Sequence, residues 1–224
     1  MCGRFTQTAT PKVIAEQFDL DEFPLFPPRY NIAPSQHVAA IRLNPEVAKR
    51  ECVALRWGLI PSWAKDLKIG NQCINTKAET VAEKPAFRAA FKKRRCLVMA
   101  DGFYEWQLQG KHKQPMWIGL RDRRPFAFAG LWEHWSPTDG EPIESCTIIT
   151  TQPNALMESI HTRMPVILDT KDYAAWLDPA FQHVDILNAL LRPFPAEHMT
   201  AFPVSTLVNN PRHDAPQCLE PISL

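Results

Sequence analysis

The chain has 224 residues, a formal net charge of +1, 45% hydrophobic residues and 22% charged residues. These are the values of an ordinary globular protein, and they exclude extended disorder and a coiled coil as the main architecture. The near-neutral balance gives no global field that would indicate nucleic acid, although a local cleft can still be basic.

The hydropathy of the chain bears on its location. Residues 1–12 lack the apolar core of a signal peptide, and no stretch approaches the roughly 18 apolar residues of a membrane helix. We therefore expect a cytoplasmic protein without a membrane anchor.

The predicted elements are short, because 21 prolines stand against only eight glycines. Thr10 and Pro11 are typical of a helix start, and the helix should run through Phe18. The tract 22–34 holds four prolines and is predicted to be irregular. Strand-like runs predict strands at 37–43, 51–57, 96–100, 103–108, 115–120, 126–132, 145–151 and 201–205. Helical periodicity predicts helices at 85–93, 153–160, 171–177 and 184–192.

The order of these elements favours one fold class. Strands follow one another through the middle of the chain instead of alternating with helices, which indicates an α+β fold with a mostly antiparallel sheet. No internal repeat or linker interrupts the pattern, so residues 1–224 are predicted to form a single domain. The segment after Met1 begins with structured sequence, and we expect the N-terminus to pack inside the fold.

Cysteine usage separates one residue from the rest. The six cysteines show neither a CxxC pair nor zinc-site spacing. Four of them sit among apolar neighbours and are predicted to be buried, namely Cys52, Cys73, Cys96 and Cys146. Loss of Met1 would give Cys2 a free amine and a thiol on adjacent carbons, with pKa values of about 7.7–8.0 and 8.5. Such a pair converts an aldehyde into an imine and then into a thiazolidine. Taken alone, Cys2 is also explained as an arbitrary second residue.

Other polar residues allow two interpretations each. Glu105 lies between aromatic residues and is either solvent-facing or a buried acid with a raised pKa. Asn75 fits an ordinary turn or cap, and His161 fits a hydrogen-bonding role at a helix end. Thr150, at the end of a strand, is either structural or a substrate contact.

Aromatic and basic residues are similarly open. Trp63 and Phe103 are either core residues or stacking surfaces for unpaired bases. We expect Trp63 to be exposed because it follows Pro61 and Ser62. The basic runs 92–95 and 121–124 are interpreted as solvated surface, the first after a helix and the second in a hairpin turn.

Five clusters of residues occur in an order and spacing that are jointly specific. They are Cys2-Gly3-Arg4-Phe5, Trp57-Gly58-Leu59-Ile60-Pro61-Ser62-Trp63, Asn75-Thr76-Lys77-Ala78-Glu79-Thr80, Asp101-Gly102-Phe103-Tyr104-Glu105-Trp106 and His161-Thr162-Arg163-Met164-Pro165. Together they resemble the SRAP (SOS response-associated peptidase) family, whose members crosslink to abasic sites in single-stranded DNA. The resemblance runs from Cys2 to the segment 204–209. It implies a partly barrel-like β core with flanking helices.

The resemblance also implies roles for four residues. Cys2, exposed by loss of Met1, would be the nucleophile that forms a thiazolidine with the ring-opened abasic sugar. Glu105 would be the general acid and base, His161 would shuttle a proton, and Asn75 would orient the amine. This chemistry requires no metal or organic cofactor, and weak lyase activity would accompany it. Met1 would be removed by an aminopeptidase or by the protein itself.

The expected partner is single-stranded DNA that contains abasic sites, and we expect a monomer. The residues predicted to contact DNA are Arg4, Trp63, Lys77, Phe103, Thr150 and Arg163. Lys77 stands where the family usually has arginine, so this phosphate contact loses its bidentate geometry. Two alternatives remain open at this point. One is a cysteine or N-terminal-nucleophile peptidase that attacks an amide through Cys2, and the other is a single-strand binder that never becomes covalent.

Overall fold

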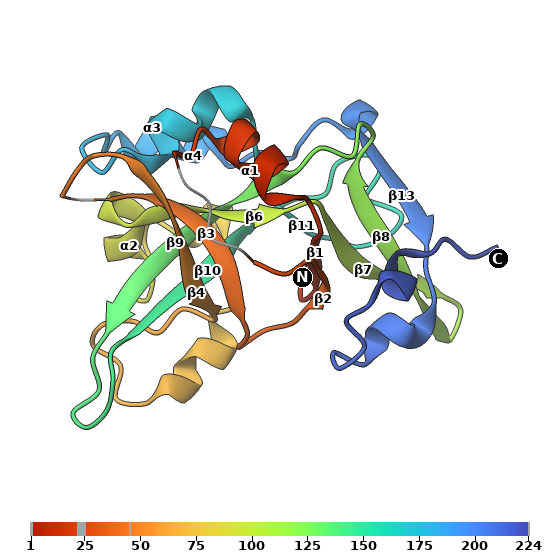
Figure 1. The fold of residues 1–224 in the computed structure, drawn as a ribbon, viewed down its shortest axis with the longest axis horizontal. Helices are drawn as coiled ribbons and strands as arrows, with labels where there is room; N and C mark the ends of the chain where they lie inside the picture. Colours follow the sequence, from red (N-terminus) through yellow and green to blue (C-terminus); the bar gives the residue numbers. More distant parts are fainter. Residues whose placement is uncertain (1, 22–25, 45, 224) are drawn as a thin grey trace.

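The computed structural model describes residues 2–21, 26–44 and 46–223, and its main feature is a closed β-barrel (Figure 1). The barrel strands are β3 (His37–Leu43), β4 (Arg50–Trp57), β6 (Arg95–Ala100), β9 (Phe126–Trp135) and β10 (Ile143–Thr151). The pairings run β10–β4–β3–β6–β9 and return from β9 to β10, which closes the ring. All of these pairs are antiparallel except β10 with β4.

Three short strands extend the edges of the barrel. β5 (Asn75–Lys77) lies parallel to β10, and β11 (Met164–Pro165) pairs with β10 antiparallel. β12 (Ile167–Leu168) pairs with β9. Strand β10 therefore brings the sequence around Asn75 close to the sequence that follows His161.

A second sheet is antiparallel throughout. Its strand order is β13 (Met199–Pro203), β8 (His112–Leu120), β7 (Gly102–Gln109), β1 (Phe5–Gln7) and β2 (Arg29–Ile32). In Figure 1, β1 and β2 lie between the barrel strands and the strands β7, β8 and β13. The start of the chain is thus enclosed between the two sheets.

Helices are short in the described part of the chain. The α-helices there are α1 (Pro11–Phe18), α2 (Arg88–Lys93), α3 (Tyr173–Leu177) and α4 (Val184–Leu190). The 3-10 helices are η1 (Leu67–Gln72), η2 (Ala78–Thr80), η3 (Thr170–Asp172), η4 (Ala196–His198), η5 (Thr206–Asn209) and η6 (Pro216–Leu219). Helices α1, α3 and α4 lie together along one side of the barrel (Figure 1). None of the described helices has the length and apolar character needed to cross a bilayer.

Strand alternation separates the two larger of the three apolar clusters in the core. On β6, Leu97 and Met99 pack outward with the helices, whereas Cys96, Val98 and Ala100 point to the other side. Both faces of the strand are covered, and every residue of β6 is buried. The second of these clusters includes Cys2 and the site described below.

The N-terminal segment packs inside the fold, as the sequence predicts. The ring of Phe5 makes edge contacts with Trp57, at 5.1 Å between centroids, and with Phe128, at 5.7 Å. Cys2 is 0% exposed. Burial of Phe5 against two barrel strands therefore anchors the first residues of the chain.

Most predicted strands form with boundaries within a few residues of those expected, and 37–43 forms residue for residue. The α+β, mostly antiparallel prediction is confirmed. The prediction of an irregular tract at 22–34 is wrong at its end, because β2 covers Arg29–Ile32 after the last of the paired prolines. Residues 22–25 lie outside the described part.

Three further expectations are corrected. The segment 153–160 forms successive turns instead of a helix, and the side chain of Asn154 accepts a hydrogen bond from the main-chain N–H of Met157. Arg95, expected on the surface, is buried and donates to the carbonyls of Phe91, Lys92 and Phe181. The turn at 121–124 joins β8 to β9, which belong to different sheets, so it is not a hairpin turn.

Candidate active site

The β1–β7 pairing brings the first residues of the chain beside Glu105. Phe5 lies opposite Phe103 and Thr6 opposite Gly102, in antiparallel register. The carbonyl of Arg4 accepts a hydrogen bond from the main-chain N–H of Tyr104 at 3.0 Å. The same register continued backwards sets residues 2 and 3 beside residues 105 and 106. Strand β7 therefore places the carboxyl group of Glu105 beside the N-terminal segment.

Asn75 contacts Cys2 directly. Its side-chain Nδ2 donates a hydrogen bond to the carbonyl oxygen of Cys2 at 2.7 Å. The Oδ1 atom of the same amide is buried and has no hydrogen-bond partner among the described residues. Because β5 is held parallel to β10, with Asn75 opposite Ile148, the amide is fixed by main-chain pairing and not by a flexible loop. Asn75 can therefore orient Cys2 and still offer an acceptor.

Glu105 and His161 form an acid–base pair. Oε2 of Glu105 lies 3.9 Å from Nε2 of His161. Nδ1 of His161 accepts from the main-chain N–H of Arg163 at 3.0 Å and lies 3.2 Å from the carbonyl oxygen of the same residue, so the main chain of Arg163 holds the ring with Nε2 toward Glu105. Burial raises the pKa of Glu105 to about 7. Burial lowers the pKa of His161, which favours the neutral ring.

The thiol of Cys2 is protonated at neutral pH. Burial raises its pKa well above the ordinary value, and the nearby carboxylate of Glu105 raises it further. The Sγ atom donates to the carbonyl of Arg4 at 3.7 Å. A thiol in this environment needs a base when it attacks, and Glu105 has the appropriate pKa and proximity.

A pocket of roughly 430 Å³ opens beside this pair. Its lining residues are Glu105, Trp106, Lys113, His161 and Asn209. Trp106 donates from Nε1 to Oδ1 of Asn209 at 2.7 Å, which ties β7 to the C-terminal segment. Three of the lining residues, Trp106, Lys113 and Asn209, are absent from the set that the sequence predicts. Trp106 adjoins Glu105 and was open to that inference, whereas the approach of Asn209 depends on tertiary packing.

Two residues predicted to contact DNA make hydrogen bonds within the protein. Arg4 donates from Nη1 to Asn31 at 3.1 Å and to the carbonyl of Val208 at 2.6 Å, so it holds the C-terminal segment. Arg163 is bound to Glu79 and to the carbonyl of Thr150. That either residue also contacts a phosphate stays a prediction.

The remaining predicted DNA contacts divide by exposure. Phe103 is fully buried against Phe128, so its ring offers no face to a base, and the stacking expectation is wrong for this residue. Thr150 is also fully buried and donates from Oγ1 to the carbonyl of Thr76. Trp63 is 59% exposed, as the sequence predicts, and Lys77 is exposed. Only the last two are accessible to DNA in this structure.

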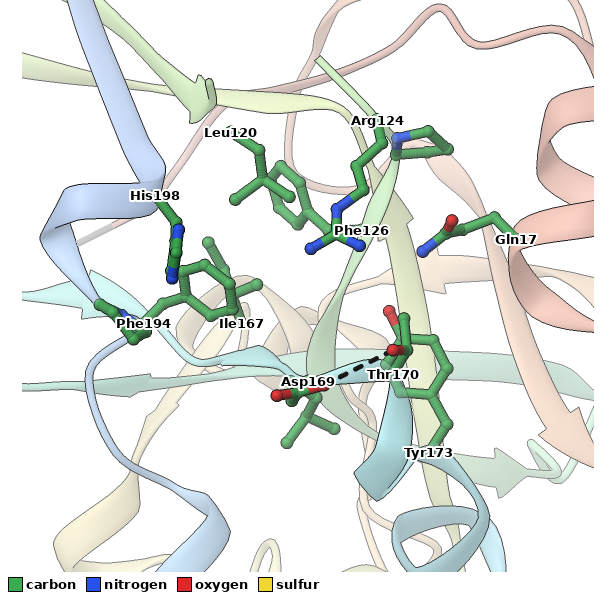
Figure 2. Close-up of a pocket in the computed structure, with 13 residues that line it drawn as sticks. Gln17, Leu120, Arg124, Phe126, Ile167, Asp169, Thr170, Tyr173, Phe194 and His198 are labelled. Atoms are coloured by element: carbon green, nitrogen blue, oxygen red, sulfur yellow. Dashed lines mark hydrogen bonds between the residues drawn. The ribbon is translucent and has the colours of Figure 1, made fainter. Parts of the chain in front are cut away.

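A second cavity lies apart from the acid–base pair. It encloses about 190 Å³ and is bordered by Gln17, Arg124, Phe126, Asp169 and Tyr173 among others (Figure 2). None of the predicted catalytic residues lines it. In the described part of the chain, no group of three or more histidine, cysteine, aspartate or glutamate side chains is arranged to hold a metal ion.

Comparison with known proteins assigns this site to a family. The family model for SOS response associated peptidase (SRAP) matches residues 1–211. The abasic site processing protein YoqW of Bacillus subtilis is 48% identical over 224 residues, which is 98% of this chain and 99% of that protein. The abasic site processing protein HMCES of Xenopus tropicalis is 36% identical over 89% of this chain and 68% of its own length.

A solved structure agrees with the same assignment. The crystal structure of a protein from Bacteroides thetaiotaomicron superposes with a TM-score of 0.89 at 27% identity, and the match covers 99% of this chain and 100% of that one. The family match spans the barrel, the second sheet and every residue of the candidate site. The chain therefore belongs to the SOS response associated peptidase (SRAP) family.

Proposed function

We propose that this protein processes abasic sites by forming a covalent thiazolidine between Cys2, after loss of Met1, and the ring-opened sugar in single-stranded DNA. The names of its relatives support DNA lesions, and not a peptide bond, as the substrate. The observation that carries the proposal is the hydrogen bond from Asn75 to the carbonyl of Cys2, at 2.7 Å. It fixes the second residue of the chain next to an acid–base pair.

The reaction begins with opening of the sugar ring. The carboxylate of Glu105 takes the proton of the 1′-hydroxyl, the C1′–O4′ bond breaks, and the same carboxyl group returns a proton to O4′. A pKa of about 7 suits this exchange, because both forms of Glu105 are populated near neutral pH. The Nε2–H of His161 donates a hydrogen bond to the sugar oxygen on which charge develops.

Bond formation then follows in two steps. The α-amine of Cys2 adds to C1′ of the aldehyde, and the carbinolamine loses water with a proton from Glu105, which leaves an imine. The thiol adds to the imine carbon while its proton passes through Glu105 to the nitrogen, and the five-membered ring closes. The net change is one aldehyde and one aminothiol converted to a thiazolidine and one water.

Asn75 directs the amine. Its Nδ2 holds the Cys2 carbonyl, and its buried Oδ1 has an open acceptor position within the same amide. Oδ1 of Asn75 accepts an N–H of the Cys2 amine, and the lone pair of the amine nitrogen then points toward the substrate. Asn75 thus acts through orientation and not through proton transfer.

Exposed residues supply the contacts to the strand. Trp63 offers an indole face to an unpaired base, and such stacking favours single strands without reading their sequence. Lys77 offers an exposed charge to a phosphate. The pocket beside Glu105 takes the sugar that lacks a base, while Trp63 and Lys77 contact the neighbouring strand.

The primary test uses a denaturing gel. The protein is incubated with a single-stranded oligonucleotide that carries one abasic site, and wild type should give a band that survives denaturation. Cys2→Ala should give none, and an equal yield from this variant would refute the proposal. A salt-sensitive complex that disappears on denaturation in both proteins would indicate a non-covalent binder.

Cys2→Ser separates the two nucleophilic groups. It keeps the α-amine but replaces the thiol, so the imine should persist and become trappable by borohydride. An imine that does not close can lose its 3′ phosphate by β-elimination, and this variant should therefore cleave the strand more than wild type does. Equal cleavage by both proteins would argue against weak lyase activity through an open imine.

Removal of Met1 is part of the proposal. The small side chain of Cys2 suits a methionine aminopeptidase, and self-removal is the alternative. Intact mass of the Glu105→Gln variant distinguishes them: retained Met1 in this variant alone indicates that the site itself removes it, and normal processing indicates an aminopeptidase.

A further inference from the structure

Both Nη atoms of the Arg163 guanidinium donate hydrogen bonds within the protein, whereas Nε is buried without a hydrogen-bond partner among the described residues. Its Nη1 and Nη2 donate to the two carboxylate oxygens of Glu79 at 2.6 and 2.9 Å, and Nη2 also donates to the carbonyl of Thr150 at 2.6 Å. The arginine side chain is only 15% exposed, whereas that of Glu79 is 43% exposed. Bidentate pairing of this kind fixes both distance and plane. The side chain of Arg163 is therefore held in one orientation by Glu79.

The main chain of the same arginine controls His161. Its N–H donates to Nδ1 of His161 at 3.0 Å and its carbonyl oxygen lies 3.2 Å from the same atom, so the ring is held with Nε2 facing Glu105 across 3.9 Å. A shift of residue 163 would release these contacts and let the imidazole turn away from Glu105. The orientation of the acid–base pair thus depends on where Arg163 is held.

Glu79 also lies in the segment that carries Asn75. It is in η2, which begins directly after β5. Strand β10 lies between this segment and the segment that holds His161, since Thr150 is opposite Lys77 of β5 on one side and opposite Pro165 of β11 on the other. The Glu79–Arg163 ion pair therefore spans β10 and joins the segment that contacts Cys2 to the segment that holds His161.

We propose that Glu79 is a positioning residue for the crosslinking reaction, which acts through Arg163 to fix the orientation of His161. This inference rests on the proposed function for its kinetic consequence but not for its structural one. The Arg163 hydrogen bond lowers the pKa of Glu79, so the carboxylate is ionised at neutral pH.

The charge of Glu79 argues against a DNA-binding role. A carboxylate near Lys77 and Arg163 repels a phosphate backbone and opposes the counterion release that drives association. Positioning, in contrast, requires a charged and bidentate partner for Arg163. Glu79 should therefore affect the rate of reaction and not the affinity for DNA.

The kinetic test measures crosslinking with protein in excess over a single-stranded oligonucleotide that carries one abasic site. The variation of rate with protein concentration gives a maximal rate and a half-saturating concentration. Glu79→Gln should lower the maximal rate about fivefold, in line with loss of a partly exposed ion pair, without weakening DNA binding. Glu83→Gln is the matched control, because it removes an exposed charge from the same segment and should change neither value.

A charge exchange tests the pair itself. Arg163→Glu and Glu79→Arg each place two like charges together and should be slower than Glu79→Gln. The double variant, which restores opposite charges at the two positions, should recover most of the lost rate. Failure of this recovery would indicate that Arg163 acts directly on DNA and would overturn the inference.

A spectroscopic test needs no DNA. The ¹⁵N chemical shifts of the imidazole report its tautomer, and the His161 resonances can be assigned by their loss in His161→Gln. Glu79→Gln should shift the His161 resonances from their wild-type positions, because the contacts of Nδ1 with the main chain of Arg163 change, whereas Glu83→Gln should not. If wild type forms no crosslink, the proposed function fails, but this spectrum still tests the positioning. An unchanged spectrum, or tighter DNA binding at an unchanged rate in Glu79→Gln, would refute it.

Discussion

Replacing Glu105 by glutamine should stabilise the protein at alkaline pH although it slows crosslinking. Glu105 is 2% exposed, and burial raises its pKa to about 7 from the ordinary value of 4.5. The folded state therefore holds the proton more tightly than the unfolded chain does. The stability that follows from this is fully present below pH 4.5 and is lost as pH rises through about 7.

The magnitude follows from the shift. A difference of about 2.5 units at about 1.4 kcal/mol per unit corresponds to about 3 kcal/mol of free energy of unfolding. Glutamine resembles the protonated acid in shape and carries no charge, so it does not lose this stability. The variant should therefore exceed wild type by up to about 3 kcal/mol at pH 8, and the two should converge near pH 4.

The assay is urea denaturation at a series of pH values between 4 and 9. Glu158→Gln provides the control, because that residue is exposed and close to His161 in sequence, and its stability difference from wild type should not vary with pH. A Glu105→Gln variant that is no more stable than wild type at pH 8, or equally more stable at every pH, would refute the description of Glu105 as a buried acid with a raised pKa.

Further predictions concern the substrate contacts. Asn75→Ala should lower the crosslinking rate about tenfold, because it leaves the Cys2 carbonyl without its partner and removes the acceptor for the amine; single-turnover kinetics check this, and an unchanged rate would exclude the role. Trp63→Ala should weaken binding to single strands by about 1–3 kcal/mol with little change in salt dependence, measured by fluorescence anisotropy. Lys113→Gln should reduce the slope of log binding constant against log salt concentration by about one. It should also raise the pKa of His161, because burial is the main cause that keeps this pKa low and the charge of Lys113 adds to it. Lys111→Gln, in the turn between β7 and β8 and outside the pocket, should do neither.

Much of the fold could be predicted because strand signals are local. The apolar run at 37–43 contains no proline or glycine, and it forms a strand with those bounds. The segment 153–160 has helical periodicity, yet it forms turns, in which the side chain of Asn154 accepts a hydrogen bond from the main-chain N–H of Met157. Competition between side-chain and helical hydrogen bonds depends on side-chain geometry, which the periodicity of the sequence does not show.

The residues that meet in the candidate site were predictable, but not all of their contacts were. Asn75, Glu105 and His161 lie close to Cys2 or to one another. The protein partners of Arg4 and Arg163 could not be predicted, because they lie 204 and 84 residues away in sequence. A basic residue in a motif has the same sequence signature whether it meets a phosphate or a polar group of the protein itself.

Intact mass spectrometry of the isolated adduct tests the central claim most directly. The account predicts a mass equal to the protein without Met1 plus the oligonucleotide minus one water, unchanged by borohydride because the thiazolidine contains no imine. Fragmentation should locate the DNA on Cys2. An adduct that retains Met1, or one that is attached to another residue, would contradict the account.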